Sequence, residues 1–520
     1  MVGLNLADGL NLVNQLNLHE AGIRVHITNS LHHQYTHSVH RGFGEPRRTR
    51  IAPHFPVSTP AVAHSARRDR KVGRDQKEEV WGTMSQQVQR GERWTGTDSW
   101  AFWSFGLGFL LENYVFSMTA IATGWVKDIP PALTSLLLAW SPLWLIIGIA
   151  VTGPLADGLG RKNAFYTTMT LYAIGAIGLV FSSSYGLILV FLAIMLFAAG
   201  GEMNTIMAAS HEIMPTKHRS KTMFLELNFI NLGGFLLAIV SVLSAYQSIA
   251  FQRGMVAVAF LLVLIVLLFA RSRTPESIPW LRQKGQADRA QREIARYYGA
   301  DEYAAREAAA ASASAPQSAQ STGASGLGLK LFATITTAFA GAAGFGLMTY
   351  VLGPHFFPTL TASILLVATG TGFFSGFFGF WADRWSRKNL LLVGYLGTVV
   401  VTGVIYLTIG VWSKNTMVFW LLLILLNVFV NIGYLTEDAL KGEVWPTRSR
   451  ASYTALVRFI SIGLYIATIY MTESLSLSAS IMFNLVVWVI GLAGAVAWFI
   501  WGHETGRGVS LETASGETRR

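Results

Sequence analysis

The chain has 520 residues, of which 52% are apolar and only 13% are charged, and its formal net charge is +11. This composition excludes a set of water-soluble domains and is typical of a membrane protein. The absence of cysteine excludes disulfides, thiolate metal sites and a cysteine nucleophile. A nucleic-acid partner is not indicated, because most lysines and arginines stand in short links between apolar runs.

The first segment, residues 1–95, is predicted to be disordered, because it shows no sustained apolar periodicity. It also lacks the apolar core that a secretory signal needs. We expect the true start to be near Met84 and the residues before it to be a dispensable tail or a wrongly extended reading frame. Most of the histidines lie in this tail, but their irregular spacing does not favour a metal site.

Twelve apolar runs follow, and each reaches the roughly 20 residues that a membrane-spanning helix needs. Helices are required because every backbone polar group in lipid needs a partner within the chain. The runs form two groups of six, at 96–272 and 330–503, with a central link at 273–329 and a tail at 504–520. The predicted spans are 100–125, 133–156, 164–182, 186–209, 222–246, 253–271, 331–352, 360–381, 389–410, 417–439, 452–472 and 481–502.

The charges in the links predict the orientation of the chain in the membrane. One side carries most of the arginines and lysines, whereas the other side has only Lys127, Arg253 and Lys414. Positive links stay in the cytoplasm, so both termini and the central link are predicted to be cytoplasmic, at the plasma (inner) membrane. Within the central link, residues 287–299 have helical spacing and are expected at the membrane surface. The Ala/Ser-rich residues 308–326 are expected to be flexible.

Two sequence motifs recur at the same place in each half, which indicates an internal duplication. Between the second and third spans of each half, a Gly-x-x-x-Asp pattern is followed by Arg-Lys. Between the fourth and fifth spans, the pattern is Glu-x-x-Pro-x-x-x-Arg. The first pattern comprises Gly153, Asp157, Arg161 and Lys162, and then Gly379, Asp383, Arg384, Arg387 and Lys388; the second comprises Glu212 and Arg219, and then Glu443 and Arg450.

With these motifs the chain resembles a transporter of the major facilitator superfamily over about residues 95–505. The segment Pro275–Leu281, PESIPWL, resembles a signature of the sugar-porter and metabolite–proton symporter branches. The resemblance implies an all-α fold of twelve helices in two pseudo-symmetric bundles that rock about a central site. It also implies that the first motif helps to hold the cytoplasmic side shut and that the second forms charge networks. The alternative is that the basic residues only orient the spans.

Four ionisable residues inside the spans are candidates for proton or substrate binding, because charge at membrane depth indicates function. Glu112 and Glu202 stand near mid-depth, and both are expected to face the central cavity. Burial and mutual repulsion favour the neutral form of such acids, which suits proton uptake and release. Glu226, nearer the cytoplasmic end, belongs to either the cavity or the gate. Arg458 is expected to bind a substrate carboxylate or to pair with Glu437 or Asp438.

These features predict a secondary active transporter that carries a small polar organic solute, such as a sugar or an organic acid, by proton symport. Glu112 is the expected proton carrier, with Glu202 nearby. The protein is expected to be monomeric, to use no cofactor or metal and not to be an enzyme, because nucleotide-binding and zinc-protease motifs are absent. The alternatives are an organic-cation carrier, a facilitative uniporter and a non-transporting sensor on the same fold.

Overall fold

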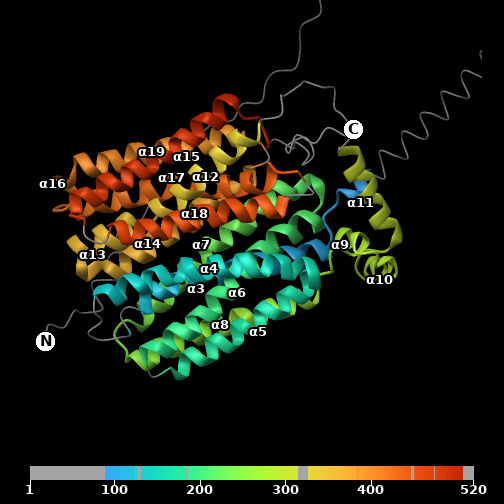
Figure 1. Cartoon of the computed structure of the whole chain (residues 1–520), viewed down its shortest axis with the longest axis horizontal. Coiled ribbons are helices and arrows are strands. Elements are labelled where there is room, and N and C mark those ends of the chain that lie inside the picture. The colour runs from blue at the N-terminus through green and yellow to red at the C-terminus, as the bar shows by residue number, and fades with distance from the viewer. Residues whose placement is uncertain are drawn as a thin grey trace, which may run out of the picture. The chain divides into compact units, whose positions relative to one another are not determined.

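The computed structural model describes residues 88–506 except 123–124, 126–130, 183, 314–325, 383, 447–449 and 473–474. A few side chains within these ranges, including those of Asp157 and Arg450, also lie outside the description. The predictions for the start at Met84 and for the end of the tail therefore fall outside the described residues. All the regular secondary structure of the described residues is helical (Figure 1).

The first half consists of six long helices. Serine side chains begin two of them, because Ser184 and Ser248 each accept a hydrogen bond from a backbone N–H in the first turn. These helices are α3 (Gly96–Ala122), α4 (Pro131–Leu159), α5 (Arg161–Phe181), α6 (Tyr185–Ile213), α7 (Arg219–Ser244) and α8 (Ile249–Ser272).

The second half also has six long helices, accompanied by shorter helical turns. Its long helices are α12 (Leu327–Gly344), α14 (Thr361–Ser375), α15 (Arg387–Leu407), α17 (Thr416–Glu443), α18 (Arg450–Thr472) and α19 (Leu477–Trp501). The turns are η3 (Leu347–Leu352), α13 (Gly353–Phe356), η4 (Pro358–Leu360), η5 (Gly376–Trp381) and α16 (Ile409–Trp412).

The two halves repeat the same packing pattern. In the first half α5 packs against α6 and α8, and α3 packs against α6, α7 and α8. In the second half α15 packs against α17 and α19, and α12 packs against α17, α18 and α19. Figure 1 shows the two groups as a blue-to-green bundle and a yellow-to-red bundle, joined where α14 meets α7 and α18 meets α4. The predicted fold of two pseudo-symmetric bundles is confirmed.

Eleven helical stretches among the described residues are long and apolar enough to cross a membrane. Helix α3 is the twelfth long helix of the two bundles. It has 27 residues and carries the polar residues Asp98, Glu112 and Asn113. The predicted first span is therefore present as a helix, and its polar residues need an explanation in the interior of the protein.

The seventh predicted span, 331–352, is not one continuous helix. Helix α12 ends at Gly344, and Gly346 has a φ of 85°, a left-handed conformation that favours glycine. Gly344 is also crowded, because a Cβ there would lie 2.4 Å from Cε2 of Trp488. The chain then continues through the turns η3 and α13. The break turns Thr349 and Tyr350 toward the interface of the two halves, where both line a cavity.

The central link folds into three short helices: α9 (Ile278–Gln283), α10 (Ala287–Tyr297) and α11 (Ala300–Ala313). Trp280, Leu281 and Ile294 belong to a small apolar core of their own. Helix α11 is attached to the start of α3, because Arg306 donates to the fully buried carboxylate of Asp98 at 2.9 Å. The first part of the Ala/Ser-rich stretch is thus helical, in contrast to the prediction, and its residues 314–325 lie outside the described residues.

Cysteine labelling tests the predicted orientation, because the native chain has no cysteine. Gln283, at the end of α9, and Gln247, between α7 and α8, are both exposed. A membrane-impermeant maleimide should label Gln247→Cys on intact cells and should label Gln283→Cys only after permeabilisation. Labelling of Gln283→Cys alone on intact cells would reverse the orientation.

Candidate functional site

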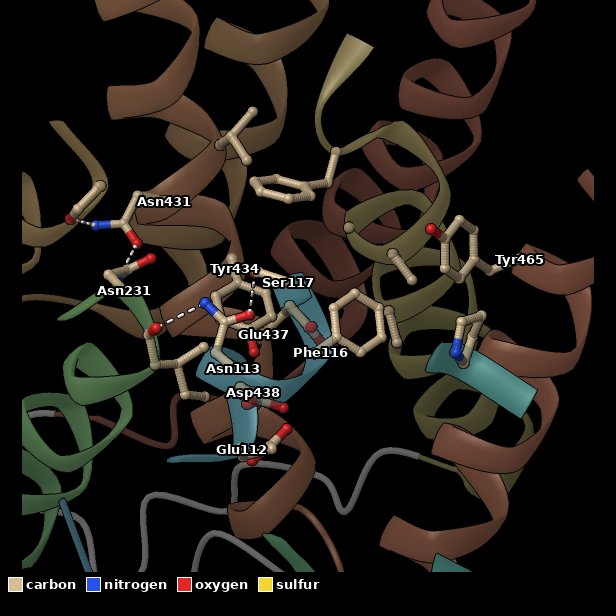
Figure 2. Close-up of a pocket in the computed structure, with 18 of the residues that line it drawn as sticks. Glu112, Asn113, Phe116, Ser117, Asn231, Asn431, Tyr434, Glu437, Asp438 and Tyr465 are labelled. Carbon is tan, nitrogen blue, oxygen red and sulfur yellow. Dashed lines mark hydrogen bonds between the residues drawn. The ribbon is translucent and has the colours of Figure 1, made fainter. Parts of the chain in front are cut away.

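A cavity of about 190 Å³ lies between the two halves. Its walls come from α3, α4, α6 and α7 of the first half and from α12, η3, α14, α17 and α18 of the second. Figure 2 shows aromatic rings on one side of this space and carboxyl groups gathered at one end. The charged residues in its lining are Glu112, Glu437, Asp438, Lys441 and Arg458.

The end of α17 and the facing side of α18 supply four of these five charges. Helix α17 continues to Glu443, so Lys441 lies in its last turn and reaches back to the acids three and four residues earlier. The Lys441 Nζ is 3.0 Å from Oε2 of Glu437 and 2.7 Å from Oδ1 of Asp438. This arrangement corrects the assignment of Lys441 to a cytoplasmic link, because the side chain is buried at the cavity.

Arg458 on α18 lines the cavity, and its partner is Asp438. Its Nη2 donates to Oδ1 of Asp438 at 3.0 Å. Its Nη1 is buried and has no hydrogen-bond partner among the described residues. Arg458 is only 2% exposed, so this unused donor is held inside the protein next to the cavity.

Glu112 on α3 contributes the fifth charge from the opposite half. Its side chain is 5% exposed, and its Oε2 has no hydrogen-bond partner among the described residues. Figure 2 shows the Glu112 and Asp438 carboxyl groups at the same end of the cavity. Among the charged groups, Arg458 acts most strongly on Glu112. Glu112 therefore lies at the cavity, as predicted.

Glu202 does not line the cavity, contrary to the prediction. It forms a buried ion pair with Arg271 of α8 and accepts a hydrogen bond from Thr168 of α5. The Arg271 guanidinium also lies 3.3 Å from the ring centroid of Phe165. Sequence reasoning missed this partner because Arg271 stands at the very end of the sixth predicted span, where a basic residue is typical of a charged flank, although its side chain is buried.

Glu226 also lies away from the cavity lining. It is fully buried between α7 and α6, where it accepts a hydrogen bond from Ser210 at 2.7 Å. Among the aromatic residues considered as cavity walls, Tyr350 lines the cavity, whereas Trp140 instead donates to the carbonyl of Leu189. The sequence alone did not separate these positions, because they are similarly apolar and similarly deep.

Asparagines join the two halves beside the cavity. Asn231 of α7 donates to Oδ1 of Asn431 of α17 at 2.8 Å (Figure 2). Asn431 in turn donates to the carbonyl of Gly372 at 2.8 Å. Asn228, one turn before Asn231, donates to the carbonyl of Phe373 at 3.0 Å. The Asn231–Asn431 and Asn228–Phe373 bonds connect helices of opposite halves and were not expected from the sequence.

The first repeated motif builds a hydrogen-bonded latch at the start of α5. Gly160 has a φ of 94° and precedes Arg161, the first residue of the helix. The buried Arg161 guanidinium donates to the carbonyl of Ala156 at 3.2 Å and to Glu212 Oε1 at 3.2 Å. The arginine of the first motif is thus bound to the glutamate of the second.

Glu276 of PESIPWL completes this latch. Its Oε1 accepts from the backbone N–H of Arg161 at 3.0 Å and of Lys162 at 3.4 Å. Burial raises the pKa of Glu276, and the backbone hydrogen bonds oppose that rise. Because the folded pKa lies above the unfolded value, the contribution of Glu276 to stability is present at acidic pH and is lost as pH rises through the folded pKa.

The same latch recurs in the second half around Arg387. Its guanidinium donates to the carbonyl of Ala382 at 3.1 Å and to Glu443 Oε1 at 3.3 Å. Its backbone N–H donates to Glu504 Oε1 at 2.8 Å. Lys388 makes the same contact as Lys162 in the first half, because the Nζ of each donates to a backbone carbonyl, at 2.9 Å for Lys388.

Glu504 was missed by the sequence analysis, which placed it in a cytoplasmic tail. It accepts the same kind of backbone N–H bond as Glu276 and also a hydrogen bond from Ser386. A signal was present, because Glu504 follows the twelfth span as Glu276 follows the sixth. Extending the internal repeat beyond the last span would have found it.

The two halves touch at the end of the helices where Arg161 and Arg387 lie. Phe224 of α7 packs against Phe378 with ring centroids 5.6 Å apart, and the Arg387 guanidinium lies 4.3 Å from the Phe224 ring centroid. A Cβ at Gly379 would lie 3.0 Å from Cβ of Phe224. The glycine of the first motif, in its second-half copy, therefore permits close contact between the halves.

Other predicted motif residues take less specific positions or lie outside the description. A Cβ at Gly153 would meet no described atom within 4 Å, so this glycine is not required there by a close contact between helices. Arg384 is exposed in the turn after η5, and Arg219 lies in the first turn of α7. The side chains of Asp157, Asp383 and Arg450 lie outside the described residues.

The Glu202–Arg271 pair is expected to stabilise the first half. Replacing Arg271 with Met leaves a buried carboxylate without its partner, a change that costs about 3–5 kcal/mol in other proteins. Arg271→Met should therefore lower the thermal unfolding temperature of the purified protein, and adding Glu202→Gln should recover part of the loss. Arg273→Met, at an exposed position two residues later, is the control. Equal unfolding temperatures for Arg271→Met and Arg273→Met would contradict this role.

Comparison with known proteins places the chain among transporters. A family model described as Major Facilitator Superfamily matches residues 101–464. The glucose transporter GlcP of Staphylococcus epidermidis is 25% identical over 444 residues, which are 79% of this chain and 95% of the relative. The niacin transporter NiaP of Acinetobacter baylyi is 28% identical over 196 residues, 36% of this chain and 43% of the relative.

A solved structure shows the same fold. The proton:xylose symporter XylE bound to 6-bromo-6-deoxy-D-glucose superposes with a TM-score of 0.64 at 16% identity, covering 80% of this chain and 98% of XylE. The family match spans most of both bundles, and the repeated latches and the paired bundles agree with it. The chain therefore belongs to the major facilitator superfamily, a family of membrane transporters and not of enzymes.

Proposed function

We propose that the chain is a secondary active transporter that takes up a small polar organic solute across the plasma membrane by proton symport. Glu112 carries the proton, and the cavity between the halves holds the solute. The observation that carries this proposal is the position of Glu112, a buried acid on the cavity wall whose Oε2 lacks a hydrogen-bond partner among the described residues.

The free-energy cost of placing the Glu112 carboxyl group inside a membrane span supports a functional role for this residue. An acid at the centre of a span costs about 2.5–3.5 kcal/mol on insertion scales, so this residue does not serve stability. A proton carrier must exchange its proton with a water-filled space, and Glu112 borders the cavity. Glu202 and Glu226 fit this role less well, because each is buried away from the cavity with a polar partner.

Alternating access accounts for the two latches. Each latch joins a helix start to the segment after the last helix of its own half, and Arg387 also lies over Phe224 of the other half. We place these contacts at the cytoplasmic side, where they hold the transporter shut until the two bundles rock. The protein acts as a monomer, because each chain holds both bundles.

Three other functions are alternatives that these experiments separate. An organic-cation carrier is favoured by the three acids of the cavity, and it is disfavoured by the two basic residues beside them. A facilitative uniporter on this fold would leave Glu112 permanently protonated. A non-transporting sensor would bind the solute without moving it.

Removing the carboxyl group of Glu112 tests proton coupling. In proteoliposomes with an inward proton gradient, the wild-type protein should accumulate solute. Glu112→Gln should equilibrate solute without accumulating it, because the amide neither binds nor releases the proton at these pH values. Glu226→Gln, which alters a buried acid outside the cavity lining and keeps an oxygen that can accept from Ser210, is the matched control and should still accumulate solute. Accumulation by Glu112→Gln at the wild-type level would remove Glu112 from the mechanism.

Removing the latch acids tests the gate. Glu276→Ala and Glu504→Ala each lose charge-assisted hydrogen bonds that are worth about 1.5–3 kcal/mol apiece. Turnover should fall about tenfold or more for each variant, whereas equilibrium solute binding should change little, because both residues lie away from the cavity lining. Glu307→Ala, at an exposed acid of α11, is the control. Loss of solute binding in a folded Glu504→Ala protein would contradict the gate assignment.

A further inference from the structure

We infer that the solute is a small monocarboxylate with a planar apolar body, bound as the anion by Arg458 when Glu112 is protonated. This inference rests on the proposed transport function and names its substrate class. It follows from three features of the cavity: the balance of charges, the unused hydrogen-bonding atoms and the asparagines.

The balance of charges makes anion binding depend on a proton. The lining holds three acids, Glu112, Glu437 and Asp438, and two bases, Lys441 and Arg458. The two bases are already bound to Asp438, and Lys441 also contacts Glu437. With all five groups charged the cavity is negative and repels an anion. One proton on Glu112 removes the uncompensated charge.

The unused hydrogen-bonding atoms match a carboxylate. Arg458 Nη1 is a buried donor without a hydrogen-bond partner among the described residues, and Nη2 is held in place by Asp438. Once protonated, Glu112 offers an O–H donor at the same end of the cavity. Two donors, one charged and one neutral, suit the two oxygens of a carboxylate. The proton and the anion thus bind together, which couples their transport.

The asparagines of the lining argue against a polyhydroxylated solute. Asn231 donates to Asn228 and Asn431, and Asn431 donates to Gly372 and Ser375. The other two asparagines also donate to the protein: Asn113 to the carbonyl of Ile230 and Asn427 to the carbonyl of Leu423. Six of the eight amide N–H groups of these four asparagines therefore donate to protein groups, which leaves few for the hydroxyl groups of a solute.

Aromatic and aliphatic side chains form most of the remaining wall, beside the hydroxyl groups of Ser117, Thr349, Thr369 and Ser461. Phe116, Phe345, Tyr350, Tyr434 and Tyr465 line the cavity, together with aliphatic residues such as Ile462. Flat rings of this kind pack against a planar apolar group. The charged end and the aromatic wall together select a solute with one anionic group and an apolar ring or chain, within a space of about 190 Å³.

The charges that face Glu112 come from both halves. Arg458, Asp438 and Lys441 act on it from α18 and α17, and Glu202 acts from α6. The charge of Glu112 also interacts electrostatically with two tyrosines, Tyr172 of α5 and Tyr434 of α17. Arg271 of α8 is held by Glu202, so its charge is compensated within the first half. Glu112 is therefore the group whose protonation is proposed to admit the anion.

Three ring-matched probes of different charge test this inference: benzoate, the neutral benzamide and the benzylammonium cation. Their equilibrium binding to the purified full-length protein is measured by calorimetry at an acidic and at a mildly alkaline pH. Benzoate should bind best, and its affinity should fall up to about tenfold per pH unit as pH rises, because one proton is bound with it. Benzamide should bind weakly at both pH values, and benzylammonium should not bind at acidic pH.

Two variants separate the roles of the two residues. Glu112→Gln should bind benzoate with little dependence on pH, because the cavity no longer gains a negative charge at alkaline pH. Arg458→Gln should lose benzoate binding. The double variant Arg458→Gln with Asp438→Asn also removes the carboxylate that Arg458 binds, and it shows whether that loss reflects charge or misfolding. Benzoate binding by the folded double variant at wild-type affinity would overturn the role of Arg458.

The results distinguish the substrate class from the transport function. Binding of benzylammonium that strengthens at alkaline pH, or failure of benzoate to bind at acidic pH, would overturn the monocarboxylate inference. Neither result affects proton-driven accumulation, which is measured separately in proteoliposomes. Conversely, benzoate binding without accumulation under a proton gradient would support the binding site and contradict proton symport.

Discussion

An ionisable side chain in the hydrocarbon layer needs a partner, and this requirement governs where the charges of the chain lie. Glu202 meets it by pairing with Arg271 inside the first half. Asp438 meets it by binding Lys441 and Arg458 in the second half. Glu112 differs from these acids because its Oε2 faces no hydrogen-bond donor among the described residues. Among the acids of the cavity, Glu112 is thus the one whose charge is not balanced by a bound base, and this is why we assign the proposed proton to it.

The internal duplication gives each half its own latch. An arginine at the start of a helix, Arg161 or Arg387, binds a carbonyl five residues earlier and a glutamate of the second motif. An acid after the last helix of each half, Glu276 or Glu504, then caps that helix start. Backbone N–H groups at a helix start have no partners within the helix, so an acid at this place accepts their hydrogen bonds. The helix dipole also stabilises the negative charge of that acid.

The cavity and the seams between the halves are built from the same helices. Helices α7 and α14 meet along one seam, α4 and α18 along the other, and all four contribute to the cavity wall. Rocking of one bundle against the other would therefore change the shape of the cavity and its access together. This shared use of helices explains why the charged end of the cavity lies between residues of α3 and residues of α17 and α18.

The sequence by itself determined the number of long helices, their division into two halves and the doubled motifs, because span length and repetition are local properties of the chain. It also predicted that Glu112 faces the cavity between the halves, since the position along a helix follows from the rise per residue. Only the tertiary structure decided which charged groups face the cavity. Glu202 lies at a similar depth but turns toward Arg271, Lys441 lies inside rather than in a link, and Glu504 binds a helix start. These outcomes depend on the rotation of each helix and on partners far away in the chain, which packing between distant segments sets.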